Sequence, residues 1–269
     1  MIFLKKEYFF TFIFSLILLV SCSGDDNISD TNNGDDGNGG GNVTIPNNNR
    51  STGVSANELL SESFFSKIYV DLVYVEGSQP TASAVSNLRS FLSARLNKSS
   101  GIEIVQKSIP ATGKTSYTIS EIVEIENTQR TRFNSQDEIA VFAFFADGES
   151  SENDGNSVVL GTAYKNTSFV IFEETLKVAA NNSSTSLATI ESTVIRHEFA
   201  HLLGLVNNGS TMQTQHQDVD NGKHCDVEDC LMFFQVETMQ GMMGLFSGGG
   251  SVPELDSQCL ADLRANGGK

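Results

Sequence analysis

Residues 183–204, SSTSLATIESTVIRHEFAHLLG, are the stretch on which the expected fold depends. The Ser and Thr residues at 183–186 can cap a helix, because their hydroxyls accept the first unpaired backbone N–H groups. Apolar side chains then recur at helical spacing as far as Gly204, a residue type that commonly ends helices; they are Ile190, Val194, Ala200 and Leu203. We therefore predict one amphipathic helix that stops at Gly204.

This helix would carry two histidines and a glutamate on one face. His197 and His201 are four residues apart, so their imidazoles lie one turn apart, and Glu198 projects beside them. Imidazole nitrogens are zinc ligands, and a carboxylate beside a catalytic zinc can act as a general base. All four histidines of the chain lie between His197 and His224. The clustering predicts a shared metal site rather than a surface helix with two histidines that bind no ligand.

Strands and one further helix are expected before the histidine helix. Residues 67–75 alternate apolar and polar side chains as a half-buried strand does, and residues 82–96 repeat apolar side chains at helical spacing. Residues 139–145, IAVFAFF, are apolar on both faces and should form a central strand. Further strands are expected at 102–105, 117–125, 158–164 and 169–172, and a last helix after Pro253. The pattern predicts a fold of the α/β (α+β) class.

The N-terminus reads as a targeting segment followed by a linker. Lys5 and Lys6 precede an apolar run that ends in Leu-Val-Ser-Cys22, which resembles the lipobox of bacterial lipoproteins. We expect a signal peptide at 1–21, a lipid anchor on Cys22, a flexible Gly- and Asn-rich tether at 22–55, and a catalytic domain at 56–269. The acidic residues after Cys22 resemble a surface-export signal. The lipid would hold the protein in the bacterial cell envelope, at the outer membrane or cell surface; the alternative is an ordinary secretory signal.

Charge and cysteine content restrict the partners and the redox chemistry. The net charge of −16 makes nucleic-acid binding improbable, because such a surface repels phosphates. The acidic loop 147–156 is either a Ca²⁺ site or, as the absence of ligand spacing favours, a solvated loop. In an exported protein, Cys225, Cys230 and Cys259 predict one disulfide and one remaining thiol, with the pairing left open. Oligomeric state is not readable.

The motif residues resemble a known class of zinc peptidases. The run from His197 to Gly204 matches the HExxHxxG core of metzincins, which continues with a third histidine where this chain has Asn207. Residues 224–232, HCDVEDCLM, resemble the H-C-x4-C-x-M element of archaemetzincins. The resemblance implies an insertion at 205–223, with His224 as third zinc ligand and Met232 as the Met-turn residue. The alternatives for the third ligand are His216, Asp218 and Asp220.

The resemblance also implies a fold and an activity. It implies a zincin-like domain: a mixed twisted sheet, an active-site helix, a Met-turn and a C-terminal helix. It implies a zinc endopeptidase that cleaves protein or peptide substrates with a zinc-bound water assisted by Glu198. Residues 158–164 would either edge the cleft or form an interior strand. Archaemetzincins bind a structural zinc through an additional C-x-x-C, whereas this chain has only Cys259 there, which favours the disulfide. The alternatives are a non-catalytic surface lipoprotein that binds glycan or protein, and a hydrolase of another amide.

Overall fold

The computed structural model describes residues 48–154, 157–246 and 250–269. The signal peptide at 1–21, Cys22 and the tether as far as residue 47 lie outside these ranges, so those assignments stay predictions. Within the described residues, no helix combines the length and the apolar character needed to cross a bilayer.

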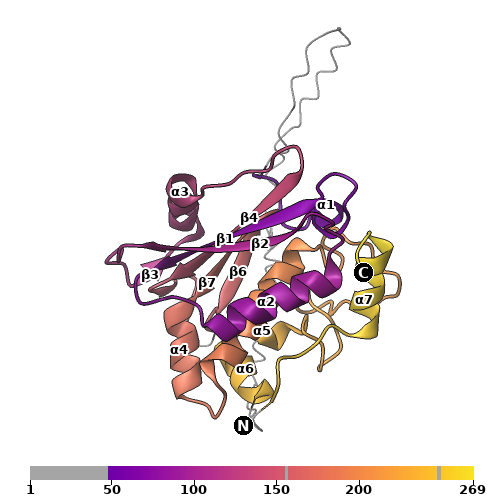
Figure 1. Ribbon diagram of the computed structural model, residues 1–269. Coiled ribbons are helices and arrows are strands. Elements are labelled where there is room, and N and C mark those ends of the chain that lie inside the picture. Colours follow the sequence, from indigo (N-terminus) through magenta and orange to yellow (C-terminus); the bar gives the residue numbers. More distant parts are fainter. Residues whose placement is uncertain (1–47, 155–156, 247–249) are drawn as a thin grey trace, which may run out of the picture. The chain divides into compact units, whose positions relative to one another are not determined.

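The structure is built on a mixed five-stranded sheet with the order β2-β1-β4-β7-β6 (Figure 1). Four strands are parallel: β1 (Lys67–Val75), β2 (Gly101–Ile109), β4 (Glu138–Ala146) and β7 (Ser168–Phe172). The edge strand β6 (Gly161–Lys165) runs antiparallel to β7. A small second sheet pairs β3 (Ser116–Tyr117) with β5 (Glu149–Ser150). The predicted α/β class with a mixed sheet is confirmed.

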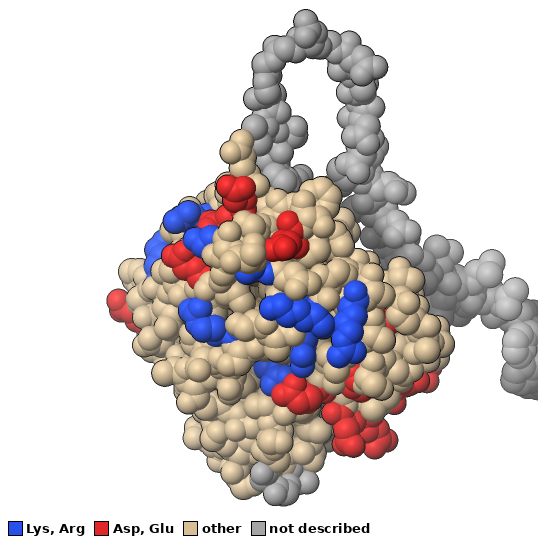
Figure 2. Space-filling model, turned by 45° about the vertical axis from the view of Figure 1, so that its right-hand side comes forward, with Lys and Arg blue, Asp and Glu red and all other residues tan. Residues whose placement is uncertain are grey.

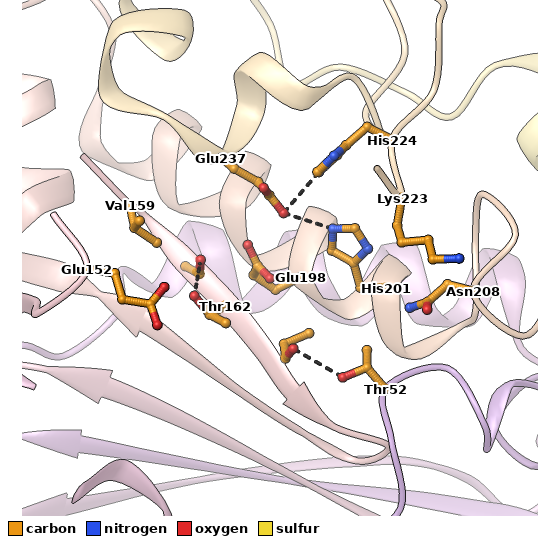
Figure 3. A pocket seen from close by; sticks show the side chains of 12 residues that line it. Thr52, Glu152, Val159, Thr162, Glu198, His201, Asn208, Lys223, His224 and Glu237 are labelled. Carbon is orange, nitrogen blue, oxygen red and sulfur yellow. Dashed lines mark hydrogen bonds and ion pairs between the residues drawn. The ribbon is translucent and has the colours of Figure 1, made fainter. Parts of the chain in front are cut away.

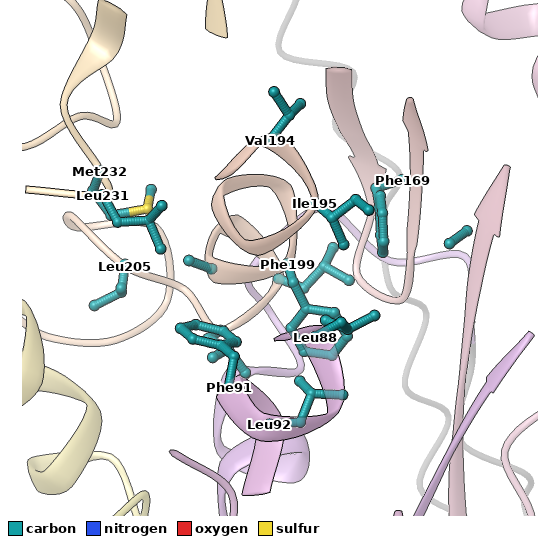
Figure 4. Close-up of a cluster of buried hydrophobic side chains, with 14 of the residues drawn as sticks. Leu88, Phe91, Leu92, Phe169, Val194, Ile195, Phe199, Leu205, Leu231 and Met232 are labelled. Atoms are coloured by element: carbon teal, nitrogen blue, oxygen red, sulfur yellow. The ribbon is translucent and has the colours of Figure 1, made fainter. Parts of the chain in front are cut away.

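Both faces of the sheet are covered. β4 is buried at all nine positions, as its doubly apolar sequence predicts. Its alternate residues Val141, Ala143 and Phe145 join the larger core, which α2 (Ala82–Arg95) and α5 (Leu187–Leu202) share. The residues between them join a smaller core with Ile122 of α3 (Ile119–Gln129). Figure 4 shows the larger core between α2 and α5, with Phe91 and Phe199 in contact with their apolar neighbours.

Shorter helices complete the domain. They are α1 (Ala56–Leu60), α4 (Glu173–Asn181), the 3-10 helix η1 (Phe234–Glu237), α6 (Met239–Leu245) and α7 (Ser257–Ala265). The C-terminal helix predicted after Pro253 is present and begins later, where the Asp256 carboxylate accepts hydrogen bonds from the backbone N–H groups of Gln258 and Cys259. On the face shown in Figure 2, Lys and Arg side chains gather beside Asp and Glu amid wide uncharged areas.

Two sequence-based predictions are wrong. Residues 117–125 do not form a strand, because Thr118 and Glu121 form a capping box that starts α3. The predicted tether also ends too late, since residues 48–55 belong to the folded domain. Asn48 is buried and its side-chain amide donates hydrogen bonds to Asn134 Oδ1 and to the Ala140 carbonyl of β4. The folded domain therefore begins before residue 56.

Candidate metal centre

Helix α5 places the first two histidines inside the protein. Ser186 caps its N-terminus by accepting the Thr189 N–H, and Gly204 follows its C-terminus with a φ of +73°. A Cβ at Gly204 would lie 2.6 Å from the Ser210 nitrogen, so only glycine fits this turn. His197 is fully buried and His201 nearly so, with their Nε2 atoms 3.1 Å apart.

The segment 205–223 brings His224 to the same place. Lys223 donates a hydrogen bond to the Asn207 carbonyl, which closes the loop, and the Asp218 N–H donates to the His224 carbonyl. The His224 ring then stacks on His197, with ring centroids 5.3 Å apart. Asn207 itself is exposed and points elsewhere, which agrees with an insertion between the helix and the third histidine.

Backbone carbonyls orient two of the imidazoles. His197 Nδ1 lies 2.6 Å from the Leu231 carbonyl oxygen, and His224 Nδ1 lies 2.6 Å from the Asn221 carbonyl oxygen. A hydrogen bond that fixes the proton on Nδ1 leaves Nε2 as a lone-pair donor, as a metal ligand requires. Met232, the predicted Met-turn residue, is fully buried next to Leu231. The turn thus positions His197.

The sequence-based reasoning missed a fourth group, Glu237. Its Oε1 atom lies 3.3 Å from His197 Nε2, 2.9 Å from His201 Nε2 and 3.0 Å from His224 Nε2. Figure 3 shows this carboxylate pointing between the imidazoles of His201 and His224. No sequence motif indicates that Glu237 contacts the histidines, because a single glutamate after the predicted Met-turn has no distinctive spacing. The chain brings it in through η1.

Glu198 lies beside the histidines in the wall of a cavity of about 400 Å³. It is fully buried, and among the described residues neither carboxylate oxygen has a hydrogen-bond partner. Gly161 of β6 leaves the room for this side chain, since a Cβ there would lie 2.9 Å from Glu198 Oε1. The cavity therefore joins an unpartnered carboxylate, the histidine cluster and the edge strand.

Burial and mutual charge shift the titration of this cluster. Burial raises the pKa of Glu198 well above its usual range, and the negative charge of Glu237 raises it further. Burial lowers the pKa of His201 to about 4. Burial alone would lower the pKa of His224, but the Glu237 hydrogen bond and charge raise it. Burial would raise the pKa of Glu237, but the three imidazoles together lower it far below its usual range.

The donor set fits a zinc ion. Three oriented imidazole nitrogens are the ligands that catalytic zinc sites use, and the four ligand atoms lie within 4.8 Å of one another. Tetrahedral zinc with bonds of about 2.0–2.2 Å needs donors separated by roughly 3.3 Å. The separations of 2.9–3.3 Å from Glu237 Oε1 to the three nitrogens are close to that requirement.

The other candidates for third ligand lie elsewhere. His216 is buried in a second cluster, described below. The Asp218 carboxylate accepts hydrogen bonds from the Asp220 N–H and the Asn221 side chain within its own turn. Asp220 contributes its backbone to that turn and is exposed. The structure thus brings His224, and not these residues, to His197 and His201.

Cys225 and Cys259 converge with His216 and Asp256 in that second cluster, and Cys230 lies beside Cys259. Cys230 and Cys259 are free thiols with sulfurs 3.7 Å apart, so the predicted disulfide is not formed in this structure. His216 Nδ1 lies 3.4 Å from Cys225 Sγ, and its Nε2 lies 2.8 Å from the buried Asp262 carboxylate. Thiolates and an imidazole held by a carboxylate are a donor set that can bind a metal ion such as zinc.

The loop at 147–156 shows no comparable arrangement within its described residues. Asp147 accepts hydrogen bonds from Thr112 and Tyr117, and Asp154 accepts one from the Ser157 N–H. Both groups of metal-ligand side chains found among the described residues lie elsewhere. The solvated-loop interpretation of this segment agrees with these contacts, and a Ca²⁺ site gains no support from them.

Comparison with known proteins gives a similarity of backbone only. No family model matches the chain, and no curated protein does. Among solved structures, archaemetzincin from Methanopyrus kandleri matches with 14% identity and a TM-score of 0.48, over 75% of this chain and 96% of that one. Metalloproteinase-II from Bacteroides fragilis matches with 13% identity and a TM-score of 0.40, over 77% of this chain and 54% of that one. The chain thus spans about half of the second protein, and the chemistry rests on the site itself.

Proposed function

We propose that this protein is a zinc-dependent endopeptidase. The observation that carries the proposal is the place of Glu198: a buried carboxylate that lines the same cavity as His201 and His224. Glu173 is also buried without a hydrogen-bond partner among the described residues, so burial alone does not mark a base; the position of Glu198 beside the imidazoles does. A general base that must accept a proton needs such a free oxygen.

His197, His201 and His224 would hold the metal. A zinc ion bound there supplies Lewis-acid chemistry, lowering the pKa of water to about 7 and polarising the scissile carbonyl. Glu198 accepts a proton from the attacking water and later gives it to the leaving amine. Leu231 and Asn221 keep the His197 and His224 rings in the tautomer that a ligand needs.

The edge strand β6 supports a peptide as substrate. Gly161, Thr162 and Ala163 line the cavity that contains Glu198, and β6 pairs with only one strand of the sheet, β7. An extended peptide can add to such an edge through main-chain hydrogen bonds. This arrangement favours a polypeptide over a small amide, because the binding groups repeat along the backbone rather than around one pocket.

Zinc content and peptide hydrolysis in three proteins test the proposal. The native protein should cleave an unstructured protein such as casein, and Glu198→Gln should lower kcat/KM by at least about 10³-fold while zinc content stays unchanged. His224→Ala should lose one equivalent of zinc relative to the native protein. Taking the difference keeps any metal in the cysteine cluster out of the comparison.

Each of three other outcomes would contradict one part of the proposal. Hydrolysis that survives Glu198→Gln would exclude Glu198 as the base. Bound zinc without hydrolysis of any peptide in the native protein would favour a non-catalytic binding lipoprotein. Unchanged zinc content in His224→Ala would remove this residue from the ligand set.

A further inference from the structure

We propose that Glu237 is a fourth protein ligand of this metal, and that residues 237–239 close the substrate groove until a peptide displaces them. The inference rests on the proposed function and adds to it a regulated, latent state. It starts from the position of one atom, Glu237 Oε1, which lies within 3.3 Å of all three imidazole Nε2 atoms.

The distances assign Glu237 to the coordination shell. A carboxylate that merely balanced charge would need to approach one imidazole, whereas this oxygen stands at nearly equal distances from three. The distances from this oxygen to the three nitrogens, and the 3.1 Å between the Nε2 atoms of His197 and His201, are close to the roughly 3.3 Å between donors of a tetrahedral ion. Catalytic zinc sites use three protein ligands and leave the fourth position open. With Glu237 in place, that position is filled by the chain itself.

The backbone around Glu237 is held on the sheet edge. The Leu160 N–H donates to the Glu237 carbonyl, and the Met239 N–H donates to the Val158 carbonyl. Val159 and Thr238 form an antiparallel bridge between these bonds. Residues 158–160 lead directly into β6, so the segment 237–239 is tied to the chain just before the edge strand. These backbone bonds hold the Glu237 carboxylate at the metal position.

The same segment stands between two cavities. The first, of about 400 Å³, is lined by Val159 and Glu237, and the second, of about 370 Å³, by Val158 and Met239. Figure 3 shows Val159 and Glu237 along one border of the first cavity. Withdrawal of residues 237–239 would join the two spaces into one groove along the edge. A groove of that length suits several residues of an extended polypeptide.

Glu237 can move away from the metal without the unfolding of a long element. Its side chain is 30% exposed, and η1 is a single 3-10 turn of four residues. A substrate that must displace Glu237 binds with an apparent affinity reduced by the fraction of open molecules. Substrate with enough contacts along β6 opens the site, and small ligands that lack those contacts compete poorly.

The test uses the full-length protein loaded with Co²⁺, whose visible absorption reports the coordination shell. Acetohydroxamate, a small metal ligand, is titrated into the native protein, Glu237→Gln and Glu237→Asp, with Glu228→Gln as the matched control. Glu228 is an exposed glutamate in the loop between Cys225 and Cys230. We expect Glu237→Gln to bind acetohydroxamate at least tenfold more tightly and Co²⁺ at least tenfold more weakly, with Glu237→Asp between it and the native protein.

Three results would overturn the inference. Equal acetohydroxamate affinity in native protein and Glu237→Gln, with Co²⁺ bound in both, removes Glu237 from the shell and leaves the peptidase proposal intact. The same gain in Glu228→Gln shows a general charge effect instead. A native protein that binds no Co²⁺ overturns this inference and the proposed function together.

Faster casein cleavage by Glu237→Gln than by the native protein is the expected second readout.

Discussion

At the scale of single residues, Gly161 leaves the room that the Glu198 side chain needs for its proposed role as general base. A Cβ at this position would lie 2.8 Å from Glu198 Cγ and 3.0 Å from Val194 Cγ1, so the glutamate must move aside. We expect Gly161→Ala to lower kcat/KM by about 10²-fold, because a shift of about 1 Å in a catalytic group has this effect. The unfolding free energy should fall by about 1–3 kcal/mol from overpacking.

Gly244→Ala is the control for this change. Its Cβ would meet nothing within 4 Å, so kinetics and stability should stay near those of the native protein. Steady-state peptide hydrolysis and urea unfolding measure both quantities. Native-like kcat/KM in Gly161→Ala would contradict the close packing of β6 against Glu198.

Residue identities alone were enough to propose His197, Glu198 and His201, because the four-residue spacing has one geometric meaning on a helix. The helix boundaries at Ser186 and Gly204 followed from capping chemistry. Glu237 could not be found in this way. Its approach depends on η1 and on the bridge between Val159 and Thr238, which are contacts between distant segments.

At the scale of elements, the segment 205–223 has two roles. It returns the chain so that His224 reaches the histidine pair, and it delivers His216 to the cysteine cluster, where His216 Nδ1 faces Cys225 and Cys259. Sequence-based counting assigned two of the cysteines to a disulfide, because an exported protein was expected and the additional C-x-x-C of archaemetzincins is missing. Only the folded loop brings the His216 imidazole to the sulfurs.

Thiol counting tests which chemistry holds this cluster. We expect Cys225, Cys230 and Cys259 all to be titratable thiols in the denatured chain purified without reductant, because no S–S bond is formed between them. We also expect one metal equivalent to be lost in His216→Ala, because His216, Cys225, Asp256 and Cys259 converge. Asn207→Ala, an exposed change in the same loop, should lose none. A single thiol among these three cysteines would instead restore the disulfide between the other two.

Helix α3 shows that local capping contacts can decide whether a short segment forms a helix or a strand. Residues 117–125, predicted as a strand, fold as a helix from Ile119. Ile119, Ile122 and Val123 lie at helical spacing, and the Thr118–Glu121 capping box satisfies N–H groups at the helix start. β4 was predictable because residues 139–145 are apolar on both faces. β1 was predictable as a strand from its alternation, although most of its residues are buried and not half-buried as that pattern suggested.

At the scale of the whole molecule, a buried acid makes stability depend on pH. Burial and the nearby Glu191 charge raise the pKa of Glu173 from 4.5 to about 10, and neither of its oxygens has a hydrogen-bond partner among the described residues. Between these two pKa values the folded state binds the proton that the unfolded state has lost. The unfolding free energy therefore falls as pH rises through this window.

Glu173→Gln removes the titration and keeps the shape. Its Tm should be close to that of the native protein at pH 5 and exceed it by on the order of a few degrees at pH 9. Glu174→Gln, a change at a partly exposed neighbour, should leave the pH dependence of the native protein. A Tm difference that stays constant from pH 5 to pH 9 would show that Glu173 does not stay protonated in the fold.

The edge strand β6 affects whether the molecule associates with a second chain. Thr52 donates a hydrogen bond to the Ala163 carbonyl in the middle of β6, and residues 237–239 pair with the residues that lead into this strand. An uncovered strand edge is a template for pairing with a second chain. If residues 237–239 leave to admit a substrate, the opened molecule also becomes more prone to self-association. The closed position of Glu237 would then limit self-association as well as proteolysis.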